Sequence, residues 1–280
     1  MTERAASKTA LGVTAVRVVH QLVDGEPKIL ADPIAPRLLS GDAVRLLEEH
    51  IGRAQDPEAR ALRARVVLRS RFAEDRLKAA VLRGVRQCVM LGAGFDTFAY
   101  RQPDWARALR LYEVDHAATQ AEKRDRLSAA GVVLPPNLEF VAIDFEKVSL
   151  DEGLRASSLD FGQPAFFSCL GVFVYLSREA VDAVFRLVAS FPAGSEIAFT
   201  FASRQAERSA LAHRVQRAGE PWRTFLDAAG LQRDLPALGF REVSILDPAQ
   251  AERIYFRGRD DGLAAPATAG VAAAIVGGAG

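Results

Sequence analysis

Hydrophobic side chains recur at intervals of three and four residues along the first 85 residues of the chain. One stripe includes Val13, Val16 and Val19, and a second runs from Leu62 to Val85. Residues three and four apart share one face of a helix, so both stretches are predicted to be helical. We expect residues 1–85 to form a helical cap that belongs to the same domain as the rest of the chain.

Beyond residue 85 the pattern changes to short apolar runs that alternate with helical stretches. This alternation is typical of a parallel sheet whose strands are joined by crossover helices. Two late apolar runs have a link too short for a crossover helix, so at least one of them should run antiparallel. The predicted helices are 116–130 and 177–190, and the predicted strands are 87–91, 111–114, 138–143, 165–170, 196–201, 242–246 and 253–256.

These elements predict an α/β fold with a mostly parallel seven-stranded sheet and helices on both faces. Residues 86–263 are expected to form its core. The last segment, 264–280, consists almost entirely of Ala, Gly and Val and carries no charge. Because it cannot form an amphipathic face, we expect a frayed or loosely docked tail there.

Composition narrows the classes of partner. The net charge of +1 favours neither nucleic acid nor an anionic membrane. Two cysteines and four histidines are too few for a disulfide framework or a zinc cluster, so no metal site is predicted. The sequence shows neither a signal peptide nor an apolar run long enough to span a bilayer, so a cytoplasmic location is expected. Nothing in it predicts the oligomeric state.

The most informative stretch is Val89–Thr97, where an apolar strand ends in Gly92-Ala93-Gly94. Glycine tolerates the dihedral angles of a tight turn and lets the backbone pass close to a small molecule. Such a turn at the carboxyl end of a strand is where nucleotide-like ligands bind in α/β sheets.

Acidic residues follow the next two strands. Asp115 lies about 20 residues after Gly94, the interval at which a carboxylate reaches ribose hydroxyls in nucleoside-binding folds. Asp144 ends the third predicted strand, where it could accept a hydrogen bond from an adenine amino group. Each residue could instead be a plain turn or a helix N-cap. Three such features at one edge of one sheet favour a nucleoside site.

A dinucleotide-binding dehydrogenase fits less well. The third glycine of its G-x-G-x-x-G motif is replaced by Thr97, and Asp96 puts negative charge where a pyrophosphate would sit. A ligand with a cationic or zwitterionic end, such as S-adenosyl-L-methionine, suits this turn better.

Four segments resemble the leucine carboxyl methyltransferase family, and most closely its bacterial branch of S-adenosyl-L-methionine-dependent methyltransferases. They are V-M-L-G-A-G-F-D-T-F-A-Y-R (Val89–Arg101), Y-E-V-D-H (Tyr112–His116), D-F-E (Asp144–Glu146) and L-G-V-F-V-Y-L (Leu170–Leu176). The resemblance covers nearly the whole chain apart from the Ala/Gly tail. It implies the Rossmann-like fold of class I methyltransferases and S-adenosyl-L-methionine as the cofactor.

The resemblance also implies cofactor-binding residues. Arg69 would hold the methionyl carboxylate, because a guanidinium matches a carboxylate in shape. The glycine turn would line the methionyl and sulfonium part, Asp115 would bind the ribose, and Asp144 with Phe145 would bind the adenine. Leu170 belongs to the same pocket. The matched positions are Arg69, Gly92, Ala93, Gly94, Asp115, Asp144, Phe145 and Leu170.

One departure from the family concerns the acceptor. Many members carry Glu before the V-x-V-Y segment, whereas this chain has Leu170-Gly171. Loss of that carboxylate argues against methylation of a protein C-terminus. We expect O-methylation of a small molecule, such as a carboxylate or hydroxyl of a metabolite in secondary metabolism. A non-catalytic sensor of the cofactor and a protein C-terminal carboxyl methyltransferase remain alternatives.

Acceptor and catalytic residues are predicted from position. Tyr175 lies just past the fourth strand, where this fold places acceptor contacts, and His116 could act as a base for a hydroxyl acceptor. A carboxylate acceptor is ionised at neutral pH and requires no base. Further candidates for acceptor binding are Arg17, Arg101, Glu220 and Trp222.

Overall fold

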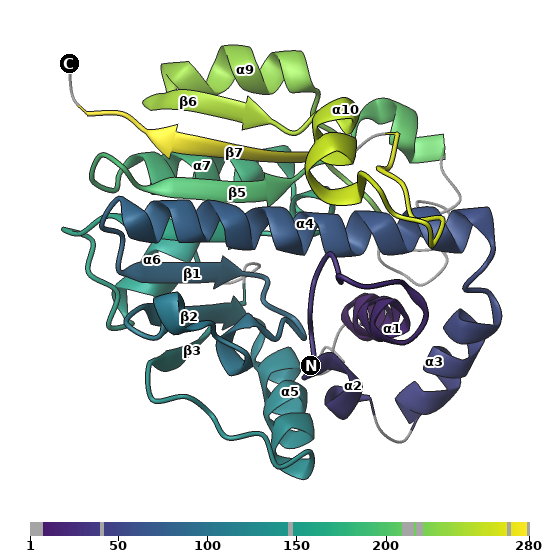
Figure 1. Cartoon of the computed structure of the whole chain (residues 1–280). Helices are drawn as coiled ribbons and strands as arrows, with labels where there is room; N and C mark the ends of the chain where they lie inside the picture. Colours follow the sequence, from purple (N-terminus) through teal and green to yellow (C-terminus); the bar gives the residue numbers. More distant parts are fainter. Residues whose placement is uncertain are drawn as a thin grey trace.

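The sheet has seven strands in the order β3-β2-β1-β4-β5-β7-β6 (Figure 1). The computed structural model describes residues 8–39, 42–144, 148–208, 216, 221–267 and 270–278. All neighbouring strands pair in parallel except β7, which is antiparallel to both β5 and β6. The strands are β1 (Gln87–Leu91), β2 (Arg110–Asp115), β3 (Leu138–Ala142), β4 (Ala165–Cys169), β5 (Glu196–Thr200), β6 (Phe240–Ile245) and β7 (Val271–Val276).

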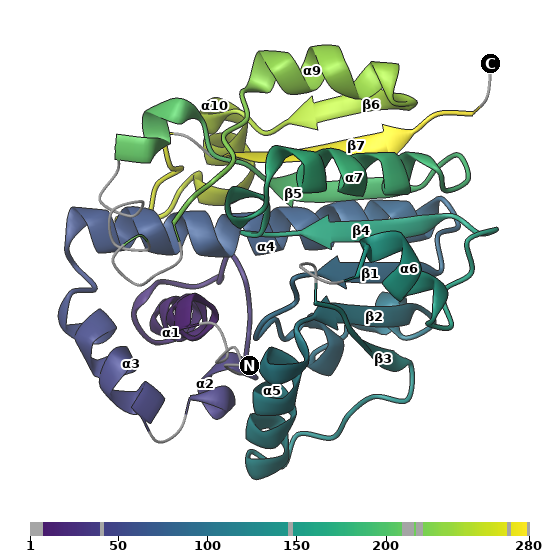
Figure 2. The same cartoon turned by 180° about the vertical axis from the view of Figure 1, so that it is seen from behind.

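Helices cover both faces of the sheet, as predicted. Helix α4 crosses the face seen in Figure 1, whereas α6, α7 and α9 cover the face seen in Figure 2. The helices are α1 (Lys8–Val23), α2 (Ala35–Leu38), α3 (Asp42–Gly52), α4 (Pro57–Leu82), α5 (Ala117–Ala129), α6 (Leu150–Arg155), α7 (Arg178–Ala189), α9 (Ala228–Ala237) and α10 (Pro248–Ala251). Short turns of tighter or wider helix are η1 (Phe98–Tyr100), η2 (Asp104–Ala106), η3 (Phe173–Tyr175), η4 (Arg204–Arg208) and η5 (Glu252–Phe256).

Strand β1 explains why the sheet has two hydrophobic cores. All five of its residues are buried, and alternate side chains point to opposite faces. Val89 and Leu91 join the core beneath α6, α7 and α9, while Cys88 and Met90 join the core beneath α4. A strand whose two faces are both buried appears in the sequence as a continuous apolar run, and such a run predicted β1.

The N-terminal helices stand beyond the carboxyl ends of the parallel strands. Helix α1 packs against α3 and α4 and lies beside the ends of β1 and β2 (Figures 1 and 2). Arg17 on α1 fixes this position, because its guanidinium lies 2.8 Å from the Asp32 carboxylate and donates to the Phe95 carbonyl at 3.2 Å. The N-terminal helices thus form a roof, with α1 at its centre, that covers the edge of the sheet where the glycine turn lies.

The prediction of a frayed C-terminal tail was wrong. Val271–Val276 is the buried strand β7, inserted between β5 and β6, and every residue of it is buried. Its uncharged sequence follows from this place, since both faces of the strand contact the core. Alternate residues join opposite cores, with Ala272 and Ala274 on one side and Val271 and Ala273 on the other.

The predicted strand at 253–256 was also wrong. Helix α10 precedes the segment, and the Asp247 side chain caps this helix by accepting from the Gln250 amide at 2.7 Å, with Pro248 in the first turn. Residues 253–256 themselves lie in the wide helical turn η5. The antiparallel strand is therefore β7, and β6 runs in the same direction as the first five strands.

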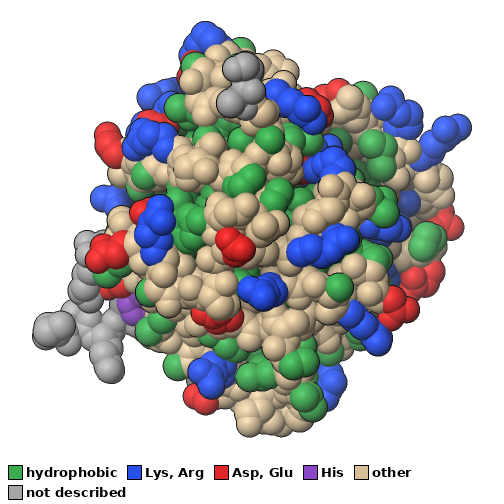
Figure 3. Space-filling view, turned by 90° about the vertical axis from the view of Figure 1, so that its left-hand side faces the viewer, with side chains coloured by type: hydrophobic (Ala, Val, Ile, Leu, Met, Phe, Trp, Pro, Cys, Tyr) green, Lys and Arg blue, Asp and Glu red, His purple; other side chains and the backbone are tan. Residues whose placement is uncertain are grey.

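The face at the amino ends of the parallel strands lies opposite the glycine turn. Lys and Arg side chains are interspersed there with Asp, Glu and hydrophobic side chains (Figure 3). Among the described residues, none of the helices is both long and apolar enough to cross a membrane.

Candidate active site

A cavity of about 630 Å³ lies beyond the carboxyl ends of β1, β2, β3 and β4, between the sheet and α1. Its volume is within the range of small-molecule sites. The glycine turn, both predicted acidic residues, Arg69, His116, Leu170 and Tyr175 all line it. Side chains that are far apart in the sequence therefore meet in one cavity.

The turn after β1 has the backbone geometry that only glycine adopts readily. Gly92 and Gly94 have φ angles of 64° and 48°, in the left-handed region. A Cβ on Gly92 would lie 2.3 Å from a methyl carbon of Val172, so a larger residue could not be accommodated without displacing that side chain. At this turn the cavity floor is therefore formed by backbone atoms of residues that have no side chain.

Asp115 is held in place by two backbone donors. One carboxylate oxygen accepts from the Gly94 amide at 2.6 Å and the other accepts from the His116 amide at 2.7 Å. A carboxylate has about four acceptor positions, so positions remain for a ligand in the cavity. The Gly94 contact joins the first and second predicted elements of the site directly.

Asp144 follows β3, and its position is tied to Asp115 through the backbone. The Ile143 amide donates to the Asp115 carbonyl at 3.0 Å, which continues the pairing of β2 and β3. The Asp144 carboxylate then lies 3.8 Å from the Nε2 atom of His116. These contacts place two acidic side chains on adjacent strand ends, as the sequence predicted.

Arg69 on α4 supplies a cation to the wall of the cavity. Within the described part of the chain, its guanidinium has no hydrogen bond or ion pair, unlike the paired Arg17. Burial lowers its pKa to about 10, and the Tyr175 and Asp96 side chains oppose that shift. A Cβ on Gly171 would lie 2.7 Å from its Nη1 atom, so the glycine leaves room for this arginine.

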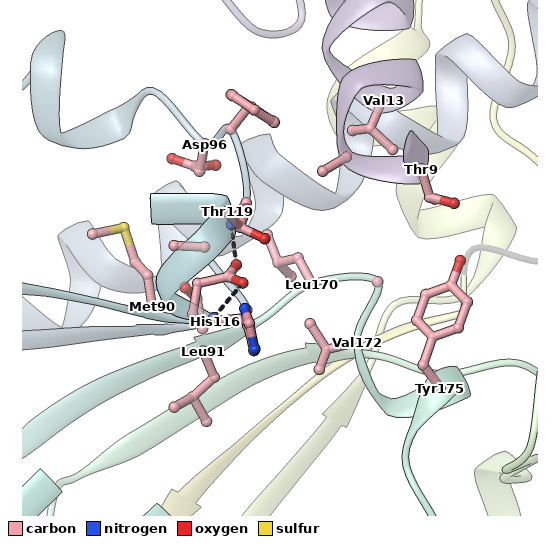
Figure 4. Close-up of a pocket in the computed structure, with 18 of the residues that line it drawn as sticks. Thr9, Val13, Met90, Leu91, Asp96, His116, Thr119, Leu170, Val172 and Tyr175 are labelled. Carbon is pink, nitrogen blue, oxygen red and sulfur yellow. Dashed lines mark hydrogen bonds between the residues drawn. The ribbon is translucent and has the colours of Figure 1, made fainter. Parts of the chain in front are cut away.

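Tyr175 lies on the other side of the cavity from His116 (Figure 4). It ends the turn η3, and its hydroxyl points toward the start of α1, where Thr9 lies. Arg223 also lines the cavity. Its backbone amide donates to the carbonyl of Val174, the residue before Tyr175, at 2.6 Å, which places it at the same end. This end of the cavity carries two hydroxyls and an exposed cation.

Two predicted acceptor residues do not line the cavity. Arg101, whose side chain is 9% exposed, donates to Glu74 and to Thr97, and it lies 3.6 Å from Asp32. Burial alone would lower the pKa of Arg101, but the Glu74 carboxylate outweighs burial and raises it. Arg101 therefore completes a buried ion-pair network that stabilises the roof.

Trp222 is the second of these residues. It packs near Phe225, with ring centroids 6.4 Å apart. Its neighbours in the sequence, Pro221 and Arg223, line the cavity, whereas Trp222 does not. The predicted residues Phe145 and Glu220 lie outside the described part of the chain.

Several lining residues were missed by sequence reasoning. Helix α1 contributes Thr9, Val13 and Thr14, and α5 contributes Thr119. No local motif marks them, since they reach the cavity only through the packing of whole helices. In the described ranges, no group of three or more His, Cys, Asp or Glu residues is arranged to hold a metal ion.

Comparison with known proteins shows which proteins the chain is similar to. A sequence model described as leucine carboxyl methyltransferase matches residues 10–189. A protein of Bacillus subtilis (strain 168) named "Putative S-adenosyl-L-methionine-dependent methyltransferase YktD" is 32% identical over 211 residues, covering 70% of this chain and 67% of the relative. A protein of the same description from Mycolicibacterium paratuberculosis is 32% identical over 224 residues, covering 76% of this chain and 72% of the relative.

Solved structures share the fold. A crystal structure of a "putative methyltransferase" from Thermobifida fusca YX matches with a TM-score of 0.60 and 18% identity, over 98% of this chain and 96% of that one. A "duf574 family protein" from Streptomyces avermitilis matches with a TM-score of 0.56 and 18% identity, over 95% and 97% of the two chains. At these identities the likeness concerns the fold alone.

Proposed function

The chain belongs to the leucine carboxyl methyltransferase family, and from that premise we propose that it O-methylates a small-molecule acceptor, with a carboxylate preferred. It is an S-adenosyl-L-methionine-dependent methyltransferase with the Rossmann-like class I fold. The predictions of family, fold and cofactor are thereby confirmed. The acceptor and the roles of individual residues remain proposals.

The charged and polar lining residues of the cavity support cofactor binding there. Arg69, which has no partner in the described part of the chain, would bind the methionyl carboxylate through its guanidinium. The remaining acceptor positions of Asp115 would take ribose hydroxyls, and Asp144 would accept from the adenine amino group. Gly92 supports this fit, because a Cβ there would collide with Val172 and narrow the floor.

The observation that carries the acceptor proposal is the separation of charge within the cavity. Two lining carboxylates, Asp115 and Asp144, follow β2 and β3. The third, Asp96, follows β1 and is paired with Arg17 at 3.5 Å. The opposite end has the hydroxyls of Thr9 and Tyr175 and the cation Arg223. An anionic acceptor is therefore attracted to the Tyr175 end and repelled from the acidic end.

The chemistry requires little from the protein beyond positioning. The bound cofactor supplies an electrophilic methyl group on its sulfonium. A carboxylate acceptor is already ionised at neutral pH, so no residue has to remove a proton. Tyr175 would donate to the acceptor and hold its attacking oxygen in line, and such alignment can contribute about 7–11 kcal/mol. Helix α1 covers the cavity and limits access of water.

Leu170 supports a small acceptor over a protein C-terminus. It stands where many members of the family carry Glu, and its side chain lines the cavity between the His116 and Tyr175 sides (Figure 4). An apolar wall offers no acceptor for the amide donors of a peptide. The family's name keeps protein carboxyl methylation as the second candidate.

Incubation of the purified chain with methyl-labelled S-adenosyl-L-methionine and a metabolite extract tests the proposal. We expect label in a small product that mild base hydrolyses, since esters are labile and ethers are not. The Arg69→Met variant, which loses the carboxylate-binding group, serves as the control and should give no labelled product. Labelling of a peptide C-terminus alone would favour the second candidate. Cofactor binding without any labelled product would favour a sensor.

A further inference from the structure

We propose that His116 is a positioning residue that orients Asp144 for recognition of the cofactor's adenine, and that it is not a general base. The inference rests on the proposed contact between Asp144 and the adenine amino group. It assigns to His116 a role different from the catalytic one that its sequence position suggested.

The protonation of the imidazole follows from its place at the start of α5. His116 is the N-cap of this helix, and its Nδ1 atom accepts from the Ala118 amide at 3.2 Å. A nitrogen that accepts a hydrogen bond carries no proton. In the neutral ring the proton is therefore on Nε2.

The protonated Nε2 faces the Asp144 carboxylate. The distance of 3.8 Å is longer than a hydrogen bond, so the two groups interact by electrostatic attraction across a short gap. The backbones on both sides are already fixed, because the His116 amide donates to Asp115 and the Ile143 amide donates to the Asp115 carbonyl. His116 is therefore placed to influence the torsion angles of the Asp144 side chain.

A role as general base conflicts with this geometry. To accept a proton at Nε2, the ring would have to carry its proton on Nδ1, which would then face the Ala118 N–H and lose the cap of α5. His116 also lies across the cavity from Tyr175, with Leu170 and Val172 between them (Figure 4). It is thus on the nucleoside side rather than at the acceptor end.

Two substitutions separate the functions of the two ring nitrogens. In His116→Asn, the amide oxygen can still cap α5 as Nδ1 does, but no donor reaches Asp144. In His116→Gln, the amide nitrogen reaches the place of Nε2, but the cap is lost. Thermal unfolding should therefore show a lower Tm for His116→Gln and an unchanged Tm for His116→Asn.

The test measures binding of S-adenosylhomocysteine and S-inosylhomocysteine by calorimetry. The second probe has a carbonyl in place of the adenine amino group, which a carboxylate repels. Wild type should prefer the first probe. We expect His116→Asn to reduce this preference about three- to tenfold, because Asp144 loses the electrostatic attraction that orients it, and His116→Gln to retain it. An unchanged preference in His116→Asn, or an equal loss in both variants, would overturn the proposal.

Asp144→Asn distinguishes this inference from the contact on which it rests. If Asp144→Asn abolishes the preference while His116→Asn leaves it intact, Asp144 recognises the adenine without His116, and only the present inference fails. If Asp144→Asn leaves the preference intact, the proposed adenine contact itself is wrong and the role of His116 is overturned with it. Loss of the preference in Asp144→Asn together with a reduced preference in His116→Asn supports the proposal.

Discussion

Asp115 combines two functions in one side chain, because it closes the glycine turn and faces the cavity. The interval from Gly94 predicted that a carboxylate would stand here, but it did not predict that the carboxylate accepts from the Gly94 amide itself. Nor could the sequence predict Thr9, Val13 or Arg223, which no spacing rule connects with the glycine turn. Local intervals identify residues at consecutive strand ends, whereas residues brought by a distant helix depend on tertiary packing.

Substitution of Asp115 should affect binding and stability together. We expect Asp115→Ala to weaken binding of S-adenosylhomocysteine by about 1–3 kcal/mol, since the ribose hydroxyls lose their acceptor. The same change leaves the Gly94 and His116 amides without their partner, so the Tm should also fall. Calorimetry and thermal unfolding check the two effects. Asp160→Ala, outside the cavity, is the control for binding, and unchanged affinity in Asp115→Ala would contradict the ribose assignment.

At the scale of elements, the sequence predicted the parallel strands and the helices between them because each carries its own periodicity. Helix α7 begins after Ser177, whose side chain caps it by accepting from the Ala180 amide at 3.2 Å. Strand β7 was missed because alanine has low β-propensity, even though the continuous apolar run of this strand resembles that of β1. Helix α10 did carry a start signal, Asp247-Pro248, which was outweighed by the aromatic and β-branched residues that follow.

Strand β7 should be indispensable for folding. Ala273 is fully buried between neighbouring strands, so Ala273→Asp would place an unpaired carboxylate in the core. We expect a loss of at least about 3 kcal/mol in the free energy of unfolding, measured by urea denaturation. Gly278→Asp, two residues beyond the strand at an exposed position, is the matched control and should unfold like wild type. Equal stability of Ala273→Asp and wild type would contradict the placement of β7.

At the scale of the whole molecule, the two ends of the chain are joined through Asp261. One of its carboxylate oxygens accepts from the Gly25 amide at 2.8 Å and the other accepts from the Leu263 amide at 3.1 Å, while Arg259 pairs with both. Burial would raise the pKa of Asp261, but these donors outweigh burial and lower it from 3.8 to about 2. The cap and the C-terminal segment are therefore held together by an ionised carboxylate.

This contact predicts a defined pH dependence. Because the pKa of Asp261 is lower in the folded protein, its stabilising contribution is present above pH 3.8 and is lost as the pH falls toward about 2. Wild type should be more stable than Asp261→Asn at pH 7, and the difference in free energy of unfolding should shrink below pH 4. Denaturant titrations at several pH values measure it. A difference that stays constant from pH 7 to pH 2.5 would show that the carboxylate is not responsible.

The proposed function depends on one arrangement, in which the ends of three parallel strands and one arginine surround the cofactor beneath α1. The most direct measurement is a crystal structure of the chain with S-adenosylhomocysteine bound. We expect the carboxylate of the ligand at Arg69, its ribose at Asp115 and its adenine at Asp144. A ligand bound outside this cavity, or bound within it with the adenine toward Tyr175, would contradict the proposed cofactor site.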